Sequence, residues 1–471
     1  MLRSRKEKQQ GMEVVILEQM VPENHLLRKI DRSIDFSFIN KLCAPLYSEN
    51  VGRPAVEPEI LFRMLFVGYL YGIRSERRLE EEINYNFAYK WFCGLGLMEK
   101  APDATTISVN RTRRFRDNDI AEKIFQEILR QAMEKKLVGG EILYTDSTHV
   151  KAKANKHKKT TVTIEKSPKA YMDELDAAIT ADREALGKKP FEKRDDDPPT
   201  TQIQQSRTDP ESGQLNKEGK PDGFHYSEHR TVDSKNNIVV NVRITPANIN
   251  DVDPITDILD DIEKRLGHQP TYMGVDAGYH NASVCHQIAS RGIQPVVGYR
   301  RHTHKGEHFG KYRFVYLKDK NTYLCPQKQE LIWKTTNRSG YREYWSDSKI
   351  CKSCPYREQC ISSSMTRRLV TRHVWQDDLE QADTFTKTHN GKRIYAWRKQ
   401  TIERSFAEAK ELHGLRYARM LGIRNMYEQS FLTAAVQNMK RIAKAFLSSL
   451  FAPAHVKTPC PLSKTWRFSA G

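Results

Sequence analysis

Long apolar runs are missing from this sequence. A membrane-spanning helix requires roughly 18–20 consecutive apolar residues, and the most apolar run near the N-terminus, residues 60–73, is shorter and is interrupted by Arg63. The first residues, MLRSRKEKQQ, are charged and lack the apolar centre of a secretion signal. We therefore expect a cytoplasmic protein with no membrane segment.

Two further shortages narrow the class of protein. The glycines Gly94 and Gly96 form too short a motif to cradle a nucleotide phosphate, so ATP dependence has no support. Cysteine is also sparse, with 8 in 471 residues. In a cytoplasmic protein we expect these cysteines to be thiols or metal ligands rather than disulfides.

Acidic residues are outnumbered by basic ones. The chain has 59 Asp and Glu against 77 Lys and Arg, a formal net charge of +18 and a pI near 9.4. Such an excess favours a polyanionic partner, either nucleic acid or an anionic membrane surface. Nucleic acid is the preferred interpretation, and added solubility is the alternative.

Residues 1–138 are expected to form a helical domain. Apolar residues at 26–38 and 60–70 recur with helical spacing, and Asp103 is placed to cap a later helix. The helix that follows carries Arg111, Arg113 and Arg114. A helix with several arginines can cross a DNA backbone, and a solvated charged face is the alternative. These three arginines are therefore candidate DNA-binding residues.

The pattern changes from helices to strands at Gly139. Strands are expected at 141–146, 224–230, 237–244, 271–276 and 293–298, with helices at 254–266 and 282–290. Their alternation over 139–300 indicates an α/β layer. The polar stretch 151–222 is expected to be a flexible insertion apart from a short helix near 172–186. That stretch begins with five lysines, namely Lys151, Lys153, Lys156, Lys158 and Lys159.

Three segments complete the expected organisation. Residues 301–372 interrupt the α/β layer with basic, aromatic and cysteine residues, residues 373–450 are helical, and residues 451–471 form a loosely ordered tail. The expected fold class is therefore α+β and multidomain.

Two aspartates follow apolar, strand-like runs. Asp146 ends the run from Glu141, and Asp276 ends the run from Thr271 between Gly274 and Gly278. In an α/β layer the carboxyl ends of strands commonly present functional groups, and the glycines would allow close approach. Each aspartate alone is more simply a cap or turn residue. Together, in so basic a chain, they favour catalysis.

A glutamate in a basic helical segment provides a third carboxylate. Glu403 and Lys410 are seven residues apart and share one helix face, so the lysine can reach a phosphate near a metal bound by the glutamate. Glu408 and Glu411 are competing acids that do not share this geometry. Three carboxylates suit Mg²⁺ or Mn²⁺, because these ions prefer hard oxygen ligands and support phosphoryl transfer.

Four cysteines are clustered in the segment 301–372. Cys351 and Cys354 form a CxxC pair, with Cys360 downstream and Cys325 upstream. Four thiols can close a tetrahedral zinc site, and structural zinc suits a segment too small to build its own core. Free thiols and a redox pair at Cys351 and Cys354 are the alternatives.

On these residues the chain resembles bacterial insertion-sequence transposases of the DDE type. The matching positions are Asp146, Asp276, Tyr395, Arg398, Glu403 and Lys410. One departure is that four residues, rather than the common three, separate Arg398 from Glu403. The N-terminal helical unit also resembles the leading domain of these enzymes, so the similarity covers most of residues 20–445.

The resemblance implies both a fold and a function. The fold would be an N-terminal helical DNA-binding domain followed by an RNase H-like core that the cysteine-bearing segment splits. Asp146, Asp276 and Glu403 would bind Mg²⁺ or Mn²⁺ for 3′-end cleavage and strand transfer, while Lys410, Arg398 and Tyr395 would contact DNA. The partners would be double-stranded transposon ends and target DNA, bound by a homodimer at the nucleoid. The alternatives are an RNase H-like nuclease without strand transfer and a DNA-binding regulator derived from a transposase.

Overall fold

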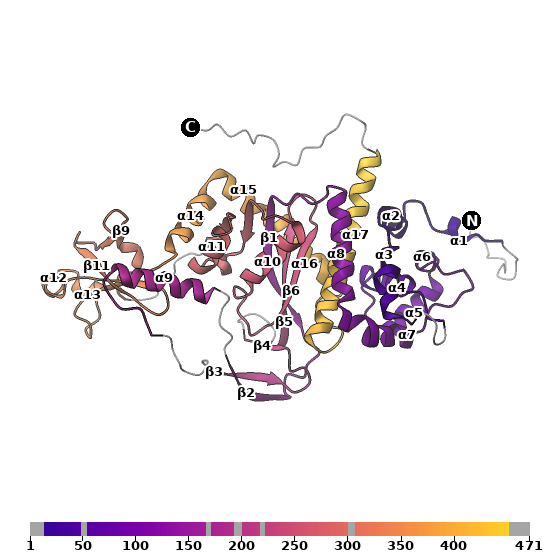
Figure 1. Ribbon diagram of the computed structural model, residues 1–471, viewed down its shortest axis with the longest axis horizontal. Coiled ribbons are helices and arrows are strands. Elements are labelled where there is room, and N and C mark those ends of the chain that lie inside the picture. The colour runs from indigo at the N-terminus through magenta and orange to yellow at the C-terminus, as the bar shows by residue number, and fades with distance from the viewer. Residues whose placement is uncertain are drawn as a thin grey trace, which may run out of the picture.

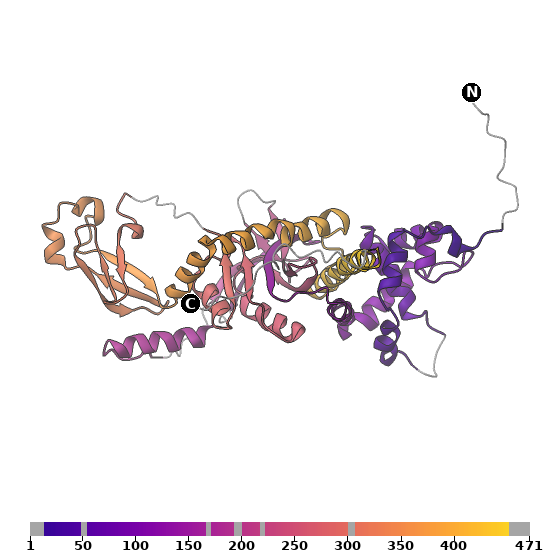
Figure 2. The same cartoon turned by 90° about the horizontal axis from the view of Figure 1, so that it is seen from above.

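The computed structural model describes residues 14–48, 54–165, 171–192, 200–216, 222–299 and 307–451. Three bodies follow one another along its long axis: N-terminal helices, a large central sheet with covering helices, and a smaller sheet at the far end (Figures 1 and 2). The mixed, multidomain class expected from the sequence is confirmed. Among the described residues, no helix is long and apolar enough to cross a membrane.

The N-terminal body is built from short helices packed around one apolar helix. Pro58 opens that helix, α4, at a position where a missing N–H costs nothing, and nearly all of its later side chains are buried. The Asp103 carboxylate accepts a hydrogen bond from the Thr106 N–H, so the predicted cap is confirmed. The helices are α1 (Leu17–Met20), α2 (Leu26–Ser33), α3 (Phe38–Cys43), α4 (Pro58–Leu70), α5 (Glu76–Tyr85), α6 (Phe87–Phe92), α7 (Ala104–Asn110) and α8 (Ile120–Glu134), with short turns η1 (Ala44–Leu46), η2 (Arg111–Phe115) and η3 (Arg116–Asn118).

The centre of the molecule is a mixed sheet. Five of its strands are β1 (Ile142–Lys151), β5 (Gly223–Asp233), β6 (Val239–Pro246), β7 (Tyr272–Val275) and β8 (Gln294–Val297). Strands β6, β5 and β1 are antiparallel neighbours, and β7 and β8 continue from β1 in parallel. Covering helices are α10 (Ile255–Leu266), α11 (Ala282–Ala289), α16 (Ile402–Leu412) and α17 (Ile423–Phe451). Helices α8 and α17 lie between this sheet and the N-terminal helices (Figure 1).

The polar stretch 151–222 contains more regular structure than its composition indicated. Its described parts hold β2 (Lys159–Glu165), α9 (Met172–Ala185), β3 (Thr200–Ser206) and β4 (Gly213–Leu215). The expectation of flexibility is wrong for these parts, whereas the helix expected near 172–186 is confirmed by α9. Strands β2 and β3 pair with each other along seven residues, and their half-buried face carries only three apolar side chains, Val162, Ile164 and Ile203, which is too short a pattern to stand out in so polar a stretch.

The far end of the molecule is an antiparallel sheet with its own small core. Its strands are β9 (Val315–Leu317), β10 (Thr322–Leu324), β11 (Glu330–Thr336), β12 (Tyr341–Trp345) and β13 (Leu369–His373), flanked by η5 (Lys311–Arg313), α12 (Ser348–Lys352) and α13 (Arg357–Cys360). Tyr323, Leu331 and Tyr344 are buried at its centre. Helices α14 (Gln376–Lys387) and α15 (His389–Trp397) and the turn η6 (Arg398–Gln400) lead back to α16. The predicted tail 451–471 lies outside the described residues except for Phe451.

Candidate active site

Asp146 and Asp276 lie on neighbouring parallel strands. The pairing of β1 with β7 places Tyr144 opposite Gly274, and each aspartate follows two residues later on its own strand. Asp146 lies within β1 rather than at its end, because the strand continues to Lys151. Asp276 caps the turn η4 (Ala277–Tyr279) through a 2.8 Å hydrogen bond that its carboxylate accepts from the Gly278 N–H. The two carboxylates therefore lie on neighbouring inner strands, level with the carboxyl end of β7.

Gly274 has a packing role. A Cβ atom at this position would lie 2.4 Å from the ring of the buried Tyr144, whose hydroxyl donates a 2.8 Å hydrogen bond to the Ile394 carbonyl. We expected Gly274 to allow backbone or substrate to approach closely around Asp276. The close neighbour is the Tyr144 side chain, which ties β1 to α15.

The environment of Asp146 disfavours its ionised form. Burial raises the pKa of Asp146 to about 6, and the negative charges of Asp276 and Asp251 act in the same direction. The Arg398 guanidinium and the Ser147 N–H oppose this rise in pKa. Carboxylates that lie close together in a partly buried position repel one another, and a bound cation would stabilise their ionised forms.

Arg398 connects the two strands to α16. Its Nη2 donates a 2.7 Å hydrogen bond to Oδ2 of Asp146, and its Nη1 lies 3.8 Å from Oε1 of Glu403. The Arg398 side chain is almost fully buried, whereas that of Glu403 is 49% exposed. Glu403 lies in the first turn of α16. Arg398 thus links Asp146 of β1 to Glu403 of α16, and Asp276 follows the strand next to that of Asp146. Within the described residues these three carboxylates do not form a group already arranged around a metal ion.

Lys410 lies on the same side of β1 as Asp146. Its Nζ donates a 2.5 Å hydrogen bond to Oγ1 of Thr148, which is two residues beyond Asp146 and therefore on the same face of the strand. Tyr395 packs its hydroxyl against Gly298 at the end of β8, and its ring lies 5.6 Å from the Arg398 guanidinium. Tyr395 is thus placed to support Arg398.

The competing acids Glu408 and Glu411 have other partners. Glu408 is ion-paired with Lys440 and Arg441 of α17. Glu411 is exposed and pairs with Arg416. Of the three glutamates, only Glu403 makes a contact with Arg398.

The three candidate DNA-binding arginines of the N-terminal body have different surroundings. Arg111 is buried between Glu76 and Glu428, so the expectation that it contacts DNA is wrong: it joins α5 to α17 instead. Arg114 stacks over the ring of Tyr47 at 4.6 Å and donates a hydrogen bond to Asn110. Arg113 is exposed and stays a candidate DNA-binding residue.

Cys325, Cys351, Cys354 and Cys360 line one small cavity at the edge of the second sheet. Burial raises the pKa of the Cys360 thiol, and the other three sulfurs lie near enough to contribute to that rise. The Cys325 carbonyl accepts a hydrogen bond from the Lys328 N–H, which closes a tight turn beside the cavity. Across the parts of the chain that the structure describes, no three His, Cys, Asp or Glu side chains form a group already arranged for a metal ion.

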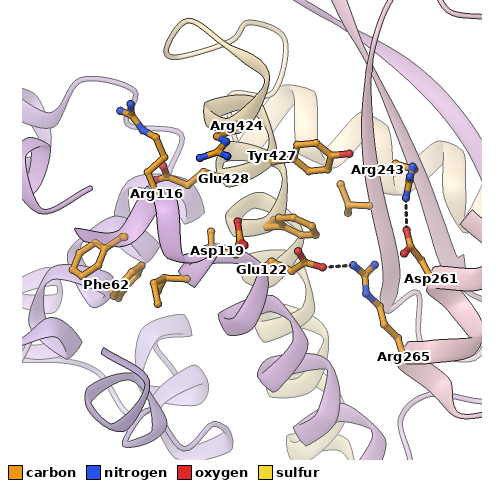
Figure 3. Close-up of a pocket in the computed structure, with 15 residues that line it drawn as sticks. Phe62, Arg116, Asp119, Glu122, Arg243, Asp261, Arg265, Arg424, Tyr427 and Glu428 are labelled. Atoms are coloured by element: carbon orange, nitrogen blue, oxygen red, sulfur yellow. Dashed lines mark hydrogen bonds and ion pairs between the residues drawn. The ribbon is translucent and has the colours of Figure 1, made fainter. Parts of the chain in front are cut away.

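A separate cavity of about 280 Å³ lies between the N-terminal body and the central sheet. Figure 3 shows its mixed charges, including the Arg265–Glu122 pair at 2.6 Å and the Arg243–Asp261 pair at 2.9 Å. None of the residues predicted to be catalytic lines it. Because the Arg265–Glu122 pair joins α10 of the central body to α8 of the N-terminal body, we interpret the cavity as part of the contact between the two bodies.

Sequence reasoning missed a buried ion pair beneath α16. Arg230 lies opposite Asp146 in the β1–β5 pairing, is fully buried, and pairs with the equally buried Glu228. Its Nη1 donates hydrogen bonds to Ser405 at 3.0 Å and to Gln437 at 2.6 Å. The signal available was the pair of opposite charges two residues apart within an expected strand, which places both side chains on one face.

Two segments of the chain match known transposase domains. Residues 15–113 match the family of transposase domains designated DUF772, and residues 324–443 match the transposase DDE domain. The second match includes Glu403 and Lys410. The transposase assigned to insertion sequence element IS402 of Burkholderia cepacia is 35% identical over 95 residues, covering 19% of this chain and 44% of that protein. The chain thus spans less than half the length of this relative.

One solved structure is also similar. It is the cryo-EM structure of a piggyBac transposase synaptic complex with hairpin DNA, with a TM-score of 0.34 and 9% sequence identity over 90% of this chain and 75% of the other. A similarity of this size carries no argument about the fold. The two matched segments and the relative support a bacterial insertion-sequence transposase of the DDE type.

Proposed function

We propose that the protein catalyses metal-dependent 3′-end cleavage and strand transfer of insertion-sequence DNA. The observation that carries the proposal is the meeting of Asp146 and Asp276 on adjacent parallel strands with Glu403, which Arg398 links to Asp146. The basic composition supports DNA as the substrate. The central sheet is proposed to be an RNase H-like core, with the first acid on a central strand and the second beside it.

The carboxylates are proposed to hold Mg²⁺ or Mn²⁺. Their oxygen atoms fit these ions chemically. Burial is the main cause of the raised pKa of Asp146, with the Asp276 charge adding to it, and a divalent cation would stabilise the ionised carboxylates. A bound ion would activate the attacking hydroxyl and stabilise the leaving oxygen. Glu403 is half exposed and can adjust its position toward the two aspartates.

The cationic side chains around the acids are proposed to position DNA. Lys410 extends along the face of β1 that carries Asp146, so its ammonium group can meet a phosphate next to the scissile bond. Arg398 keeps one nitrogen on Asp146 and can offer others to the displaced strand, with Tyr395 behind it. Arg113 is a candidate for contact with the backbone farther away.

The cysteine cluster is proposed to hold structural zinc. Thiolate sulfur is the ligand type that zinc prefers, and three chain segments bring four such groups to one cavity beside a small core. The test is the zinc content and melting temperature of the purified full chain. We expect about one zinc per chain, and a lower zinc content and melting temperature for Cys354→Ser than for the wild type. Zinc-free protein of unchanged stability would contradict this assignment.

The remaining parts of the proposal concern organisation. Residues 1–138 would bind DNA, residues 139–300 and 373–450 would form the catalytic core, and residues 301–372 would be an insertion in it. The protein would act in the cytoplasm, at the nucleoid, as a homodimer on paired DNA ends.

The proposal is tested with DNA from the flanks of the protein's own gene, incubated with Mg²⁺ or Mn²⁺. We expect cleaved 3′ ends and joined products from the wild type. Cleavage without joining would indicate an RNase H-like nuclease. Tight binding without cleavage under either metal would indicate a DNA-binding regulator and would overturn the proposal.

A further inference from the structure

The lysine-rich segment 151–159 and the two-stranded ribbon of β2 and β3 have no role in the site described above. We propose that together they form an arm that binds duplex DNA beside the active site, with the lysines on phosphates and the ribbon in the major groove. This inference rests on the proposed function for the identity of the DNA, and it adds a surface that the chemistry of the three acids does not require.

The position of the arm follows from the length of β1. The strand continues five residues past Asp146 to Lys151, which corresponds to about 17 Å at roughly 3.3 Å per residue. Lys151 is fixed there because its N–H donates to the Arg416 carbonyl and its carbonyl accepts from the Ala418 N–H. The chain then enters the basic segment and β2. DNA held at Asp146 therefore has the lysines within about half a helical turn, since one turn of B-DNA is about 34 Å.

The charge of the arm is strongly positive. Residues 151–165 and 200–208 carry five lysines and Arg207 against one carboxylate, Glu165 at the end of β2. All five lysines are exposed, and none forms an ion pair with another described residue. Arg207 joins the cluster because its N–H donates a 2.9 Å hydrogen bond to the Lys158 carbonyl. A concentration of unneutralised cations is the electrostatic footprint of a phosphate-binding surface.

The ribbon of β2 and β3 has a width and a set of exposed side chains that suit the major groove of DNA. A two-stranded antiparallel ribbon fits the major groove of B-DNA, where Thr and Gln side chains can hydrogen-bond base edges. Strand β2 exposes Thr161 and Thr163, and β3 exposes Gln202, while Gln204 donates a 2.8 Å hydrogen bond to Thr161. In Figure 1 the ribbon projects below the central sheet, away from both flanking bodies.

A second copy of the chain is the alternative binding partner of the ribbon, because β2 is the edge strand of the sheet and could pair with another edge strand. Edge strands can pair with other edges, and lysines at an edge oppose such pairing through repulsion. Lys158 and Lys159 lie where β2 begins. The charge therefore favours DNA over self-association.

The test compares two triple variants of the full chain. In the arm variant Lys153, Lys156 and Lys158 are changed to Gln. In the matched control Lys123, Lys135 and Lys264, exposed lysines on and beside α8 and α10, are changed to Gln. Binding to duplex DNA from the flanks of the gene is measured by fluorescence anisotropy across a salt series, without divalent metal.

We expect the arm variant to reduce the slope of log K against log salt by about 2.7, since each phosphate contact contributes about 0.9. Near 0.1 M salt this corresponds to a loss of affinity on the order of 10²–10³-fold, whereas the control should change the slope by less than about 1. Thr161→Ala with Gln202→Ala should reduce discrimination between flank DNA and unrelated DNA while leaving the slope unchanged.

Three results would overturn the proposal. Equal slopes for the arm variant and the control would show that only net charge matters. A slope in the arm variant equal to that of the wild type would show that these lysines do not contact phosphates. A change in the mass of the DNA-free protein in the arm variant alone would assign the ribbon to a contact between copies. Because binding is measured without metal, failure of cleavage and joining would leave this result standing, and the two proposals fail separately.

Discussion

Glu408 and Glu403 lie on the same helix, and their substitution should have opposite consequences. Glu408 is only 13% exposed and is paired with Lys440 and Arg441 of α17, while Nε2 of the buried His413 lies 3.8 Å away. Burial raises the pKa of Glu408, but hydrogen bonds from His413 and Lys440 and the charge of Arg441 outweigh it, so the net pKa lies well below its usual value. The carboxylate is therefore ionised throughout the neutral range.

Glu408→Gln removes the only anion that pairs with these cations in the part of the chain that the structure describes. Breaking a buried pair by removing one partner costs about 3–5 kcal/mol, and partial exposure here places the expected loss near about 3 kcal/mol. Glu411→Gln is the matched control on the same helix. Glu411 and Arg416 are 62% and 53% exposed, so loss of their pair should cost about 0–1 kcal/mol.

The free energy of unfolding is measured by urea titration of the full chain, and DNA cleavage is measured below the melting temperature of each variant. Glu408→Gln should cleave DNA at nearly the wild-type rate, whereas Glu403→Gln should lose cleavage and keep its stability. Equal destabilisation by Glu408→Gln and Glu411→Gln would refute the packing argument. Loss of cleavage in folded Glu408→Gln would refute the choice of Glu403.

Three further outcomes follow from the same contacts. Arg230→Met leaves Glu228 buried without its partner and should lower the free energy of unfolding by about 3–5 kcal/mol in urea titration, with partial recovery when Glu228→Gln is added. Burial lowers the pKa of His373 to about 4. Its unfolded pKa is near 6.5, so stability is complete above that pH and falls by up to about 3 kcal/mol toward pH 4, a dependence that His373→Asn should weaken in pH-dependent melting. Arg398→Ala removes the cation that lowers the pKa of Asp146, so the pH–rate profile of cleavage should shift to higher pH.

The elements with strong local signals were predictable. Residues 60–70 combine an opening proline with a continuous apolar run, and they form the buried helix α4. Asp276 follows a short strand, as its glycine-flanked position indicated. The shared face of Glu403 and Lys410 follows from helical periodicity alone.

What the sequence could not predict depends on contacts between distant residues. Arg398 and Asp146 are 252 residues apart in the sequence, so no local sequence pattern predicts the 2.7 Å hydrogen bond between them. Arg111 looked like a solvated or DNA-binding residue because its neighbours are polar, yet glutamates from two other helices enclose it. Strands β2 and β3 bring only Val162, Ile164 and Ile203 to their half-buried face, and the polar residues around these three made the stretch resemble a flexible segment.

The most direct test of the central claim locates the metal on the folded chain. Fe²⁺ would replace Mg²⁺, and the hydroxyl radicals produced with ascorbate and peroxide would cut the backbone beside the bound ion. We predict cuts near Asp146, Asp276 and Glu403, all three suppressed by excess Mg²⁺ and by Asp146→Asn. Cuts that omit one of these three positions, or that persist in Asp146→Asn, would contradict a shared metal site.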